Sequence, residues 1–160
     1  MAMSGPLAAP ATHITIRGLT KSFAGQPLYT NFDLDFPKGR ITSVFGPNGC
    51  GKSTMINMVA GLLPMDGGQV LFDGADVTNY QPAKRGIAMV FQSYALYPHM
   101  TVATNMGFGL KIAKVAPSEI AAKVAAAAKT LQIEHLLQRR PKDLSGGQRQ
   151  RVAIGRAIVR

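Results

Sequence analysis

The first half of the chain carries short segments in which apolar and polar residues alternate. In residues 13–17 (HITIR) and 31–36 (NFDLDF) every second side chain is apolar, and this period of two is typical of a half-buried strand. Short apolar runs at 41–45 (ITSVF), 69–72 (QVLF) and 87–91 (IAMVF) predict further strands. The pattern therefore predicts a sheet in the part of the chain that contains these five segments.

Helical periodicity appears in two other places. Residues 53–61 follow a glycine-rich loop and predict a buried helix. A second helix is predicted to begin at Pro117 and Ser118, because apolar residues then recur at steps of four, three and four: Ile120, Val124, Ala127 and Leu131. Strands followed by helices predict a mixed α/β fold with a helical insertion.

Composition narrows the class of protein. Hydrophobic residues make up 46% and charged residues 16% of the 160 residues, which supports a buried core and excludes a disordered chain. The single cysteine excludes a disulfide framework. The longest uncharged run, 86–110, is broken by glycine, proline and polar residues, and the N-terminus lacks the features of a secretory signal. We therefore expect a soluble protein of a reducing compartment.

The formal net charge of +10 is unevenly distributed. Residues 1–80 carry five basic and five acidic side chains, whereas residues 81–160 carry the other thirteen basic side chains and three acidic ones. Such an excess indicates either a surface that binds polyanions or a basic segment whose acidic neighbour is missing.

The loop that follows the predicted strand at 41–45 carries the most specific motif, and we call it the phosphate loop. Its sequence, GPNGCGKST, matches G-x-x-x-x-G-K-[ST] between a strand and a helix. Glycines let the backbone curl so that its N–H groups surround phosphate oxygens, and the helix adds its positive N-terminal end. Lys52 then reaches the β- and γ-phosphates, and the Ser53 hydroxyl ligates Mg²⁺. The predicted nucleotide-binding residues are Gly46, Pro47, Asn48, Gly49, Cys50, Gly51, Lys52, Ser53 and Thr54. We interpret Cys50 as a small filler residue, with a reactive thiol as the alternative.

A second motif, LSGGQRQR at 144–151, opens another helical stretch. Ser145 and Gln148 form an S-x-x-Q capping box, and a glycine-rich helix N-terminus is also a site for anions. Together with the phosphate loop and with Gln92 in VFQSYALYPHMTV, in this order, the motif resembles the ATP-binding subunits of ABC transporters. The resemblance extends from His13 onward and is closest to importers of sugars and similar small solutes.

The resemblance implies a site shared by two subunits. Two ATP-binding subunits would face each other head to tail, each ATP lying with Mg²⁺ between the phosphate loop of one and the signature of the other. The signature residues assigned to ATP are Ser145, Gly146, Gly147 and Gln148. Gln92 would sense Mg²⁺ and the attacking water, as a catalytic residue and a metal ligand. Phe23 would stack on adenine, with packing in the core as the alternative. Residues 94–100 would meet a coupling helix of the membrane subunit, although an apolar run is by default core.

The same resemblance divides the chain. It implies a flexible N-terminal tail at 1–12 and a partial ATP-binding domain, with a nucleotide-binding α/β part at 13–92 and a helical subdomain at 93–160. In the family the signature helix is followed by a strand ending in Asp-Glu (Walker B), a D-loop and a switch histidine, and the 160 residues include none of them. We therefore interpret the chain as a piece of a longer protein that is inactive as an ATPase on its own.

The predicted function is that of the ATP-binding subunit of an ABC importer, coupling ATP binding and hydrolysis to solute uptake. Its predicted partners are a second ATP-binding subunit and transmembrane permease subunits, with no specific nucleic acid, at the cytoplasmic face of the cell membrane as a peripheral protein. The alternative is a soluble ABC-type ATPase that acts on nucleic acid or ribosomes. The stretch between Gln92 and Ser145 has no heptad repeat for a coiled-coil arm, which favours the importer.

Overall fold

The computed structural model describes residues 12–159. The chain forms two compact units, of which the first ends at Ile87 and the second begins at Ala88. Of the predicted N-terminal tail, residues 1–11 lie outside the described residues, and Thr12 is already the first residue of a strand. Gln92 therefore belongs to the second unit.

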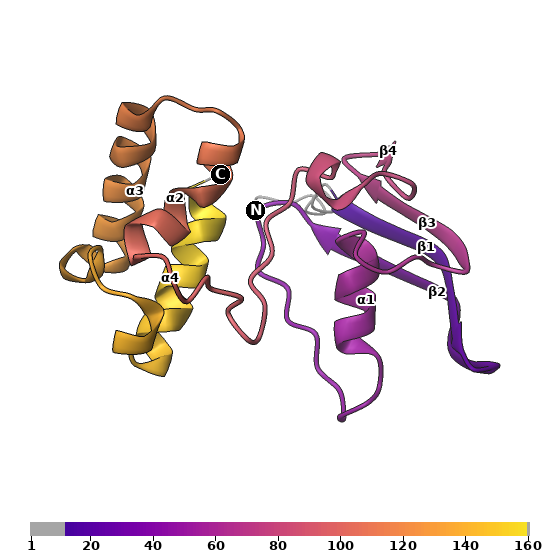
Figure 1. Cartoon of the computed structure of the whole chain (residues 1–160). Helices are drawn as coiled ribbons and strands as arrows, with labels where there is room; N and C mark the ends of the chain where they lie inside the picture. Colours follow the sequence, from indigo (N-terminus) through magenta and orange to yellow (C-terminus); the bar gives the residue numbers. More distant parts are fainter. Residues whose placement is uncertain (1–11, 160) are drawn as a thin grey trace, which may run out of the picture. The chain divides into compact units, whose positions relative to one another are not determined.

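The first unit is built on a four-stranded antiparallel sheet (Figure 1). Its spatial order is β2-β1-β3-β4. The strands are β1 (Thr12–Phe23), β2 (Gln26–Pro37), β3 (Gly67–Phe72) and β4 (Ala75–Asp76). The three strands predicted at 13–17, 31–36 and 69–72 are confirmed, and all three extend beyond the predicted segments.

One face of this sheet packs against helix α1 (Lys52–Val59), which confirms the helix predicted behind the glycine-rich loop. The fully buried side chains of this core are Ile16, Leu19, Met55 and Met58. Partly buried aromatic and aliphatic residues of β2 complete it, among them Tyr29 and Phe32. The sheet and its core thus hold the helix that follows the phosphate loop.

Two predicted strands are wrong. Residues 41–45 and 87–91 have no regular secondary structure, and Ile41 and Phe45 are 99% and 89% exposed. A strand is stable only where a neighbouring strand completes its hydrogen-bond ladder. Within residues 12–159 the four strands pair with one another and no further strand lies beside either run.

The second unit is a small helical bundle of α2 (Val102–Ile112), α3 (Pro117–Leu131) and α4 (Gly146–Ile158). The predicted helical face of α3 is confirmed: Val124 and Ala127 are buried in a core with residues of α2 and α4. Short 3₁₀ turns lie at Glu134–Leu136 and Pro141–Asp143, and another, Pro82–Lys84, belongs to the first unit. Within residues 12–159, no helix combines the length and apolar character needed to cross a membrane.

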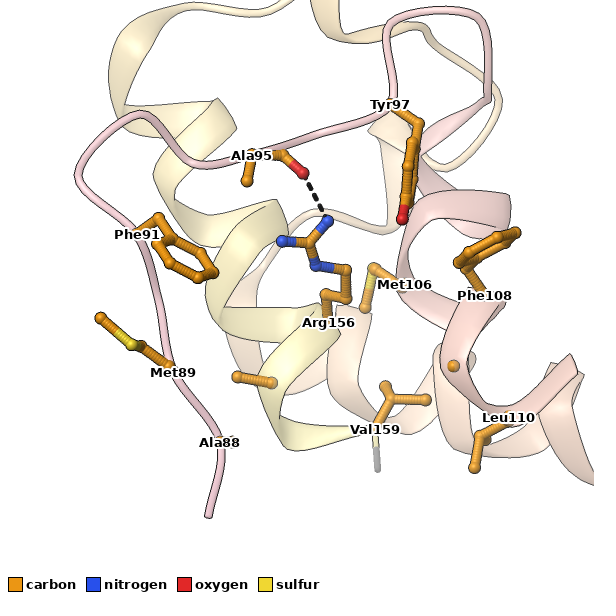
Figure 2. Close-up of a pocket in the computed structure, with 12 residues that line it drawn as sticks. Ala88, Met89, Phe91, Ala95, Tyr97, Met106, Phe108, Leu110, Arg156 and Val159 are labelled. Carbon is orange, nitrogen blue, oxygen red and sulfur yellow. Dashed lines mark hydrogen bonds between the residues drawn. The ribbon is translucent and has the colours of Figure 1, made fainter. Parts of the chain in front are cut away.

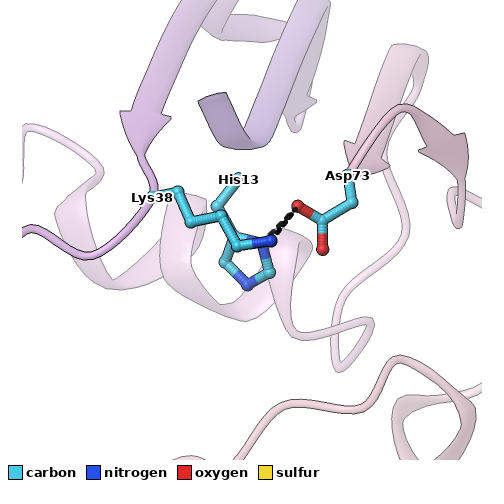
Figure 3. Close-up of polar contacts among 3 residues, drawn as sticks. All are labelled: His13, Lys38 and Asp73. Carbon is cyan, nitrogen blue, oxygen red and sulfur yellow. Dashed lines mark hydrogen bonds and ion pairs between the residues drawn. The ribbon is translucent and has the colours of Figure 1, made fainter. Parts of the chain in front are cut away.

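Two acidic side chains tie together segments at the margins of the sheet. Asp73, in the turn after β3, accepts hydrogen bonds from His13 Nδ1 at 2.9 Å and from Lys38 Nζ at 3.5 Å (Figure 3). Asp66 lies 2.7 Å from Lys21 Nζ and accepts a second bond from the N–H of Ser22 at 2.7 Å. Because the Lys21 side chain is only 10% exposed, Asp66 compensates a largely buried cation.

Replacement of Asp66 by asparagine should make the free energy of unfolding less sensitive to a fall in pH. The Lys21 ammonium, followed by the Ser22 N–H, holds the pKa of Asp66 below its ordinary value of 3.8. A lowered folded pKa contributes stability that is present above the unfolded pKa and is lost as the pH falls through the folded pKa. Urea unfolding measured between pH 7 and pH 3 should therefore show less loss in Asp66→Asn than in the wild type. An unchanged slope in Asp66→Asn would contradict this account.

Candidate nucleotide-binding site

The phosphate loop runs from Gly46 to the first turn of α1. Gly49 and Gly51 adopt positive φ angles of 81° and 98°, a region that side chains other than glycine rarely occupy. The loop closes through a long hydrogen bond from Cys50 N to Pro47 O at 3.4 Å, and α1 begins with Met55 N bonded to Gly51 O at 2.9 Å. The N-cap residue of α1 is Gly51, which has no side chain to cap the helix. Its first-turn N–H groups and its positive dipole end are therefore available to an anion.

The side chain of Lys52 folds back over this loop. Its ammonium donates to Gly46 O at 2.7 Å and Pro47 O at 2.6 Å and lies 3.6 Å from Cys50 Sγ. Ser53, in the first turn of α1, is exposed. A hydroxyl oxygen is the hard type of ligand that Mg²⁺ takes, so Ser53 fits the role that the motif predicts for it.

Tyr29, which the sequence analysis did not single out, lies against the loop at Gly51. A Cβ atom on Gly51 would lie 2.8 Å from the Tyr29 hydroxyl oxygen and 3.0–3.1 Å from its ring carbons. The ring also packs against Phe32 at 5.3 Å between centroids. Burial, followed by the nearby thiol of Cys50, raises the pKa of Tyr29. Tyr29 precedes the alternating segment of β2 that identified the strand, so only the three-dimensional structure shows its contact with Gly51.

The signature motif lies in the second unit, at the start of α4. Ser145 is the N-cap: its hydroxyl accepts from Gln148 N at 3.3 Å, and Gln148 Oε1 accepts from Ser145 N at 2.9 Å. The predicted capping box is confirmed. Gly146 and Gly147 are exposed in the first turn. Beside them lies a hollow of about 320 Å³ whose lining includes His135 and Arg151, so the helix end is open to a ligand.

The remaining predicted residues are exposed. Gln92 lies in a turn at the start of the second unit. Phe23, at the end of β1, is 49% exposed with Lys21 Nζ 5.5 Å from its ring centroid, so the alternative of core packing is wrong. The first unit thus holds Phe23 and the phosphate loop, and the second holds Gln92 and the signature. The contacts described for the phosphate loop lie within the first unit, and those described for the signature lie within the second.

Comparison with known proteins identifies the family. The family model described as ABC transporter matches residues 29–160. The chain belongs to the ABC transporter ATP-binding family. Two solved structures agree with this assignment and with the predicted α/β fold. A nucleotide-free ATP-binding cassette from an ABC transporter is 32% identical with a TM-score of 0.81, over 92% of this chain and 65% of that one. The chain cbiO1 from Clostridium perfringens, part of the ABC transporter complex cbiONQ, is 29% identical with a TM-score of 0.82, over 93% and 62%.

Curated relatives are more similar in sequence to this ABC chain. The uncharacterized ABC transporter ATP-binding protein YurJ of Bacillus subtilis is 56% identical over 92% of this chain and 40% of its own length. The sn-glycerol-3-phosphate import ATP-binding protein UgpC of Bordetella avium is 52% identical over 92% and 41%. The alpha-glucoside transport ATP-binding protein AglK of Rhizobium meliloti is 52% identical over 93% and 41%. The chain therefore spans about two fifths of the length of these relatives.

The second unit of this ABC chain also carries an apolar groove of about 470 Å³ (Figure 2). Phe91, Tyr97, Met106 and Phe108 line it, and the side chain of Arg156 extends from α4 into its middle. The Arg156 guanidinium donates to Ala95 O at 2.6 Å and to Tyr94 O at 3.3 Å, and it lies 6.0 Å from the Tyr97 ring. Part of the predicted docking segment, residues 94–100, is thus held to the signature helix.

Asn105 of α2 holds the other end of that segment. It is fully buried, and its Oδ1 accepts from Tyr97 N at 2.8 Å. Its amide nitrogen lies 3.0–3.2 Å from three carbonyl oxygens, those of Tyr97, Met100 and Thr101. One side chain therefore accepts from one backbone N–H of the turn and lies within hydrogen-bond distance of three of its carbonyls. The Tyr97 side chain is 38% exposed at the groove.

Proposed function

We propose that this chain is the nucleotide-binding part of an ABC importer subunit that couples ATP binding and hydrolysis to solute uptake. The observation that carries the proposal is the uncapped start of α1, with Lys52 and Ser53 behind a loop of glycines in positive-φ conformations. The names of its relatives UgpC and AglK, which refer to sn-glycerol-3-phosphate import and alpha-glucoside transport, support uptake of a small polar solute.

In this proposal the residues of the chain divide the work of binding Mg-ATP. Lys52 and the loop N–H groups hold the phosphates. The oxygen atoms of Ser53 and Gln92 are suitable Mg²⁺ ligands, and the metal would supply charge neutralisation at the phosphates. Phe23 stacks on adenine. The signature residues 145–148 act on the nucleotide of a second ATP-binding subunit, in a head-to-tail dimer.

Nucleotide binding should protect Cys50 from alkylation. The chain has one cysteine, and it is exposed in the phosphate loop, so the thiol reports on this loop alone. With Mg-ATP at ten times its dissociation constant, about one site in ten is free, and the alkylation rate should fall about tenfold. The rate is followed by mass spectrometry, with a small free thiol as the control for the reagent. An equal rate with and without Mg-ATP would contradict nucleotide binding at this loop.

We further propose that the groove beside residues 94–100 receives an apolar helix of a transmembrane permease subunit. Its aromatic and methionine lining suits an apolar helix face, and the hydrogen bonds of Asn105 and Arg156 pre-organise its rim. In this proposal the chain is a peripheral subunit at the cytoplasmic face of the membrane.

Hydrolysis, in this proposal, depends on parts of the longer protein. The ammonium of Lys52 and the amide of Gln92 cannot accept a proton from the attacking water. The purified chain should therefore bind Mg-ATP but release phosphate only at background rate, in a phosphate-release assay with Lys52→Ala as the control for contaminating ATPases. Robust turnover that disappears in Lys52→Ala would show that the chain is a complete catalyst.

A further inference from the structure

Arg85 makes an unusual set of contacts in the first unit. It is only 7% exposed, and its guanidinium donates to four main-chain carbonyls. Two belong to the C-terminal end of α1, Met58 O at 2.9 Å and Val59 O at 2.8 Å. The other two belong to the segment after β4, Thr78 O at 2.6 Å and Tyr80 O at 3.1 Å. A single side chain therefore joins the end of α1 to residues 78–80.

The chain leaves α1 in a way that makes room for this guanidinium. Gly61 follows the helix with φ +75°, and a Cβ atom there would lie 2.6 Å from Arg85 Nε and 2.8 Å from its Cζ. The last carbonyls of a helix have no partner within the helix and carry its negative dipole end. The planar fork of arginine suits several acceptors in fixed positions better than the flexible ammonium of lysine does.

Burying this cation costs free energy, so its contacts must provide a compensating gain. Burial lowers the pKa of Arg85, and the charge of Asp76 only partly opposes that effect. Within residues 12–159 no carboxylate forms an ion pair with Arg85, so carbonyl oxygens alone solvate it through direct hydrogen bonds. A buried charge is costly to keep, and a shorter neutral side chain would serve if only space had to be filled. The structure instead uses the charge to hold one end of α1.

The opposite end of α1 is the nucleotide site. The helix has eight residues, so the residues that Arg85 contacts lie roughly 10 Å along its axis from Lys52. A short helix moves as one body, because its hydrogen bonds connect every turn. Fixing its C-terminal carbonyls therefore also fixes the position of Lys52 and Ser53.

We propose that Arg85 is a positioning residue for nucleotide binding. By clamping the C-terminal end of α1 to residues 78–80, it holds Lys52, Ser53 and the start of the helix in the geometry that receives the phosphates. This inference rests on the proposed function, since it assumes that the phosphate loop binds Mg-ATP.

Three variants and one control test the inference in the full chain. Arg85→Lys keeps the charge but loses the planar fork, Arg85→Gln loses the charge, and Gly61→Ala displaces the guanidinium without altering it. Lys84→Gln removes the same charge from the exposed neighbouring position and is the matched control. Calorimetry measures the dissociation constant of Mg-ATP, circular dichroism measures folding, and the alkylation rate of Cys50 without nucleotide reports on the loop at the far end of the helix.

The expected result is a dissociation constant about tenfold higher in Arg85→Gln and Gly61→Ala, with Arg85→Lys between them and the wild type. The alkylation rate of Cys50 should change in the same order while the proteins stay folded, a response that a purely local role at residue 85 would not produce. Lys84→Gln should match the wild type in both measurements.

Wild-type affinity and alkylation rate in folded Arg85 variants would overturn the inference. Unfolding of all three variants would overturn it as well, because Arg85 would then stabilise the unit as a whole instead of placing the helix. Failure of the wild type itself to bind Mg-ATP would refute the proposed function on which the inference rests, and the Cys50 protection experiment identifies that case separately.

Discussion

Replacement of Lys52 by alanine is expected to weaken Mg-ATP binding by at least about tenfold. The ammonium now bonds to Gly46 O and Pro47 O, and in the proposed complex it exchanges these carbonyls for the β- and γ-phosphates. Charge-assisted hydrogen bonds of this kind contribute roughly 1.5–3 kcal/mol, and each 1.4 kcal/mol corresponds to about a factor of ten in affinity. Alanine removes both bonds and the charge.

Isothermal titration calorimetry on the folded chain measures this effect. Lys129→Ala removes the same charge from the exposed surface of α3 and should bind Mg-ATP as the wild type does, at the same ionic strength. Comparable affinities in Lys52→Ala and Lys129→Ala would leave the phosphate-loop assignment without support.

Gly51→Ala is expected to damage the site both by backbone strain and by a steric clash. Alanine at φ +98° is strained by about 1–2 kcal/mol, and its Cβ would lie 2.8 Å from the hydroxyl of Tyr29. The Tyr29 ring packs against Phe32, so the clash would move the loop and the start of α1. We expect a lower free energy of unfolding and a loss of Mg-ATP affinity greater than strain alone produces.

Two comparisons separate the strain from the clash. Gly49→Ala also has a positive φ, 81°, but its Cβ would meet nothing within 4 Å, so it should show the conformational cost alone. In Tyr29→Leu the hydroxyl and ring atoms are absent, and adding Gly51→Ala to that background should cost less than it does in the wild type. Equal effects of Gly51→Ala in both backgrounds, measured by urea unfolding and calorimetry, would exclude the contact with Tyr29 as the cause.

Local sequence patterns predicted the features that depend on local geometry. The alternation at 31–36 identified β2, and the spacing of Ser145 and Gln148 identified the cap of α4, because both are properties of a few neighbouring residues. The phosphate loop could likewise be located, since its glycine and lysine positions are fixed by backbone conformation and phosphate chemistry.

Features that depend on distant partners could not be predicted in this way. The run at 41–45 is as apolar as a buried strand, but apolarity does not specify a neighbouring strand, and Phe45 is exposed. Nothing in the sequence around Arg85 indicates a buried cation, because two of its four acceptors, Met58 and Val59, lie more than twenty residues away in the chain. Tyr29 likewise owes its role to a glycine more than twenty residues away.

The hydrogen bonds of Asn105 make this position sensitive to the loss of a single nitrogen atom. Replacement of Asn105 by aspartate would turn its amide into a carboxylate of nearly the same shape, but the side chain would lose its N–H donors. The carbonyl oxygens of Tyr97, Met100 and Thr101, which now receive its N–H groups, would then face a negative charge in a buried site. Loss of that single nitrogen would release the turn that forms the rim of the groove, so the shape of the groove depends on one amide.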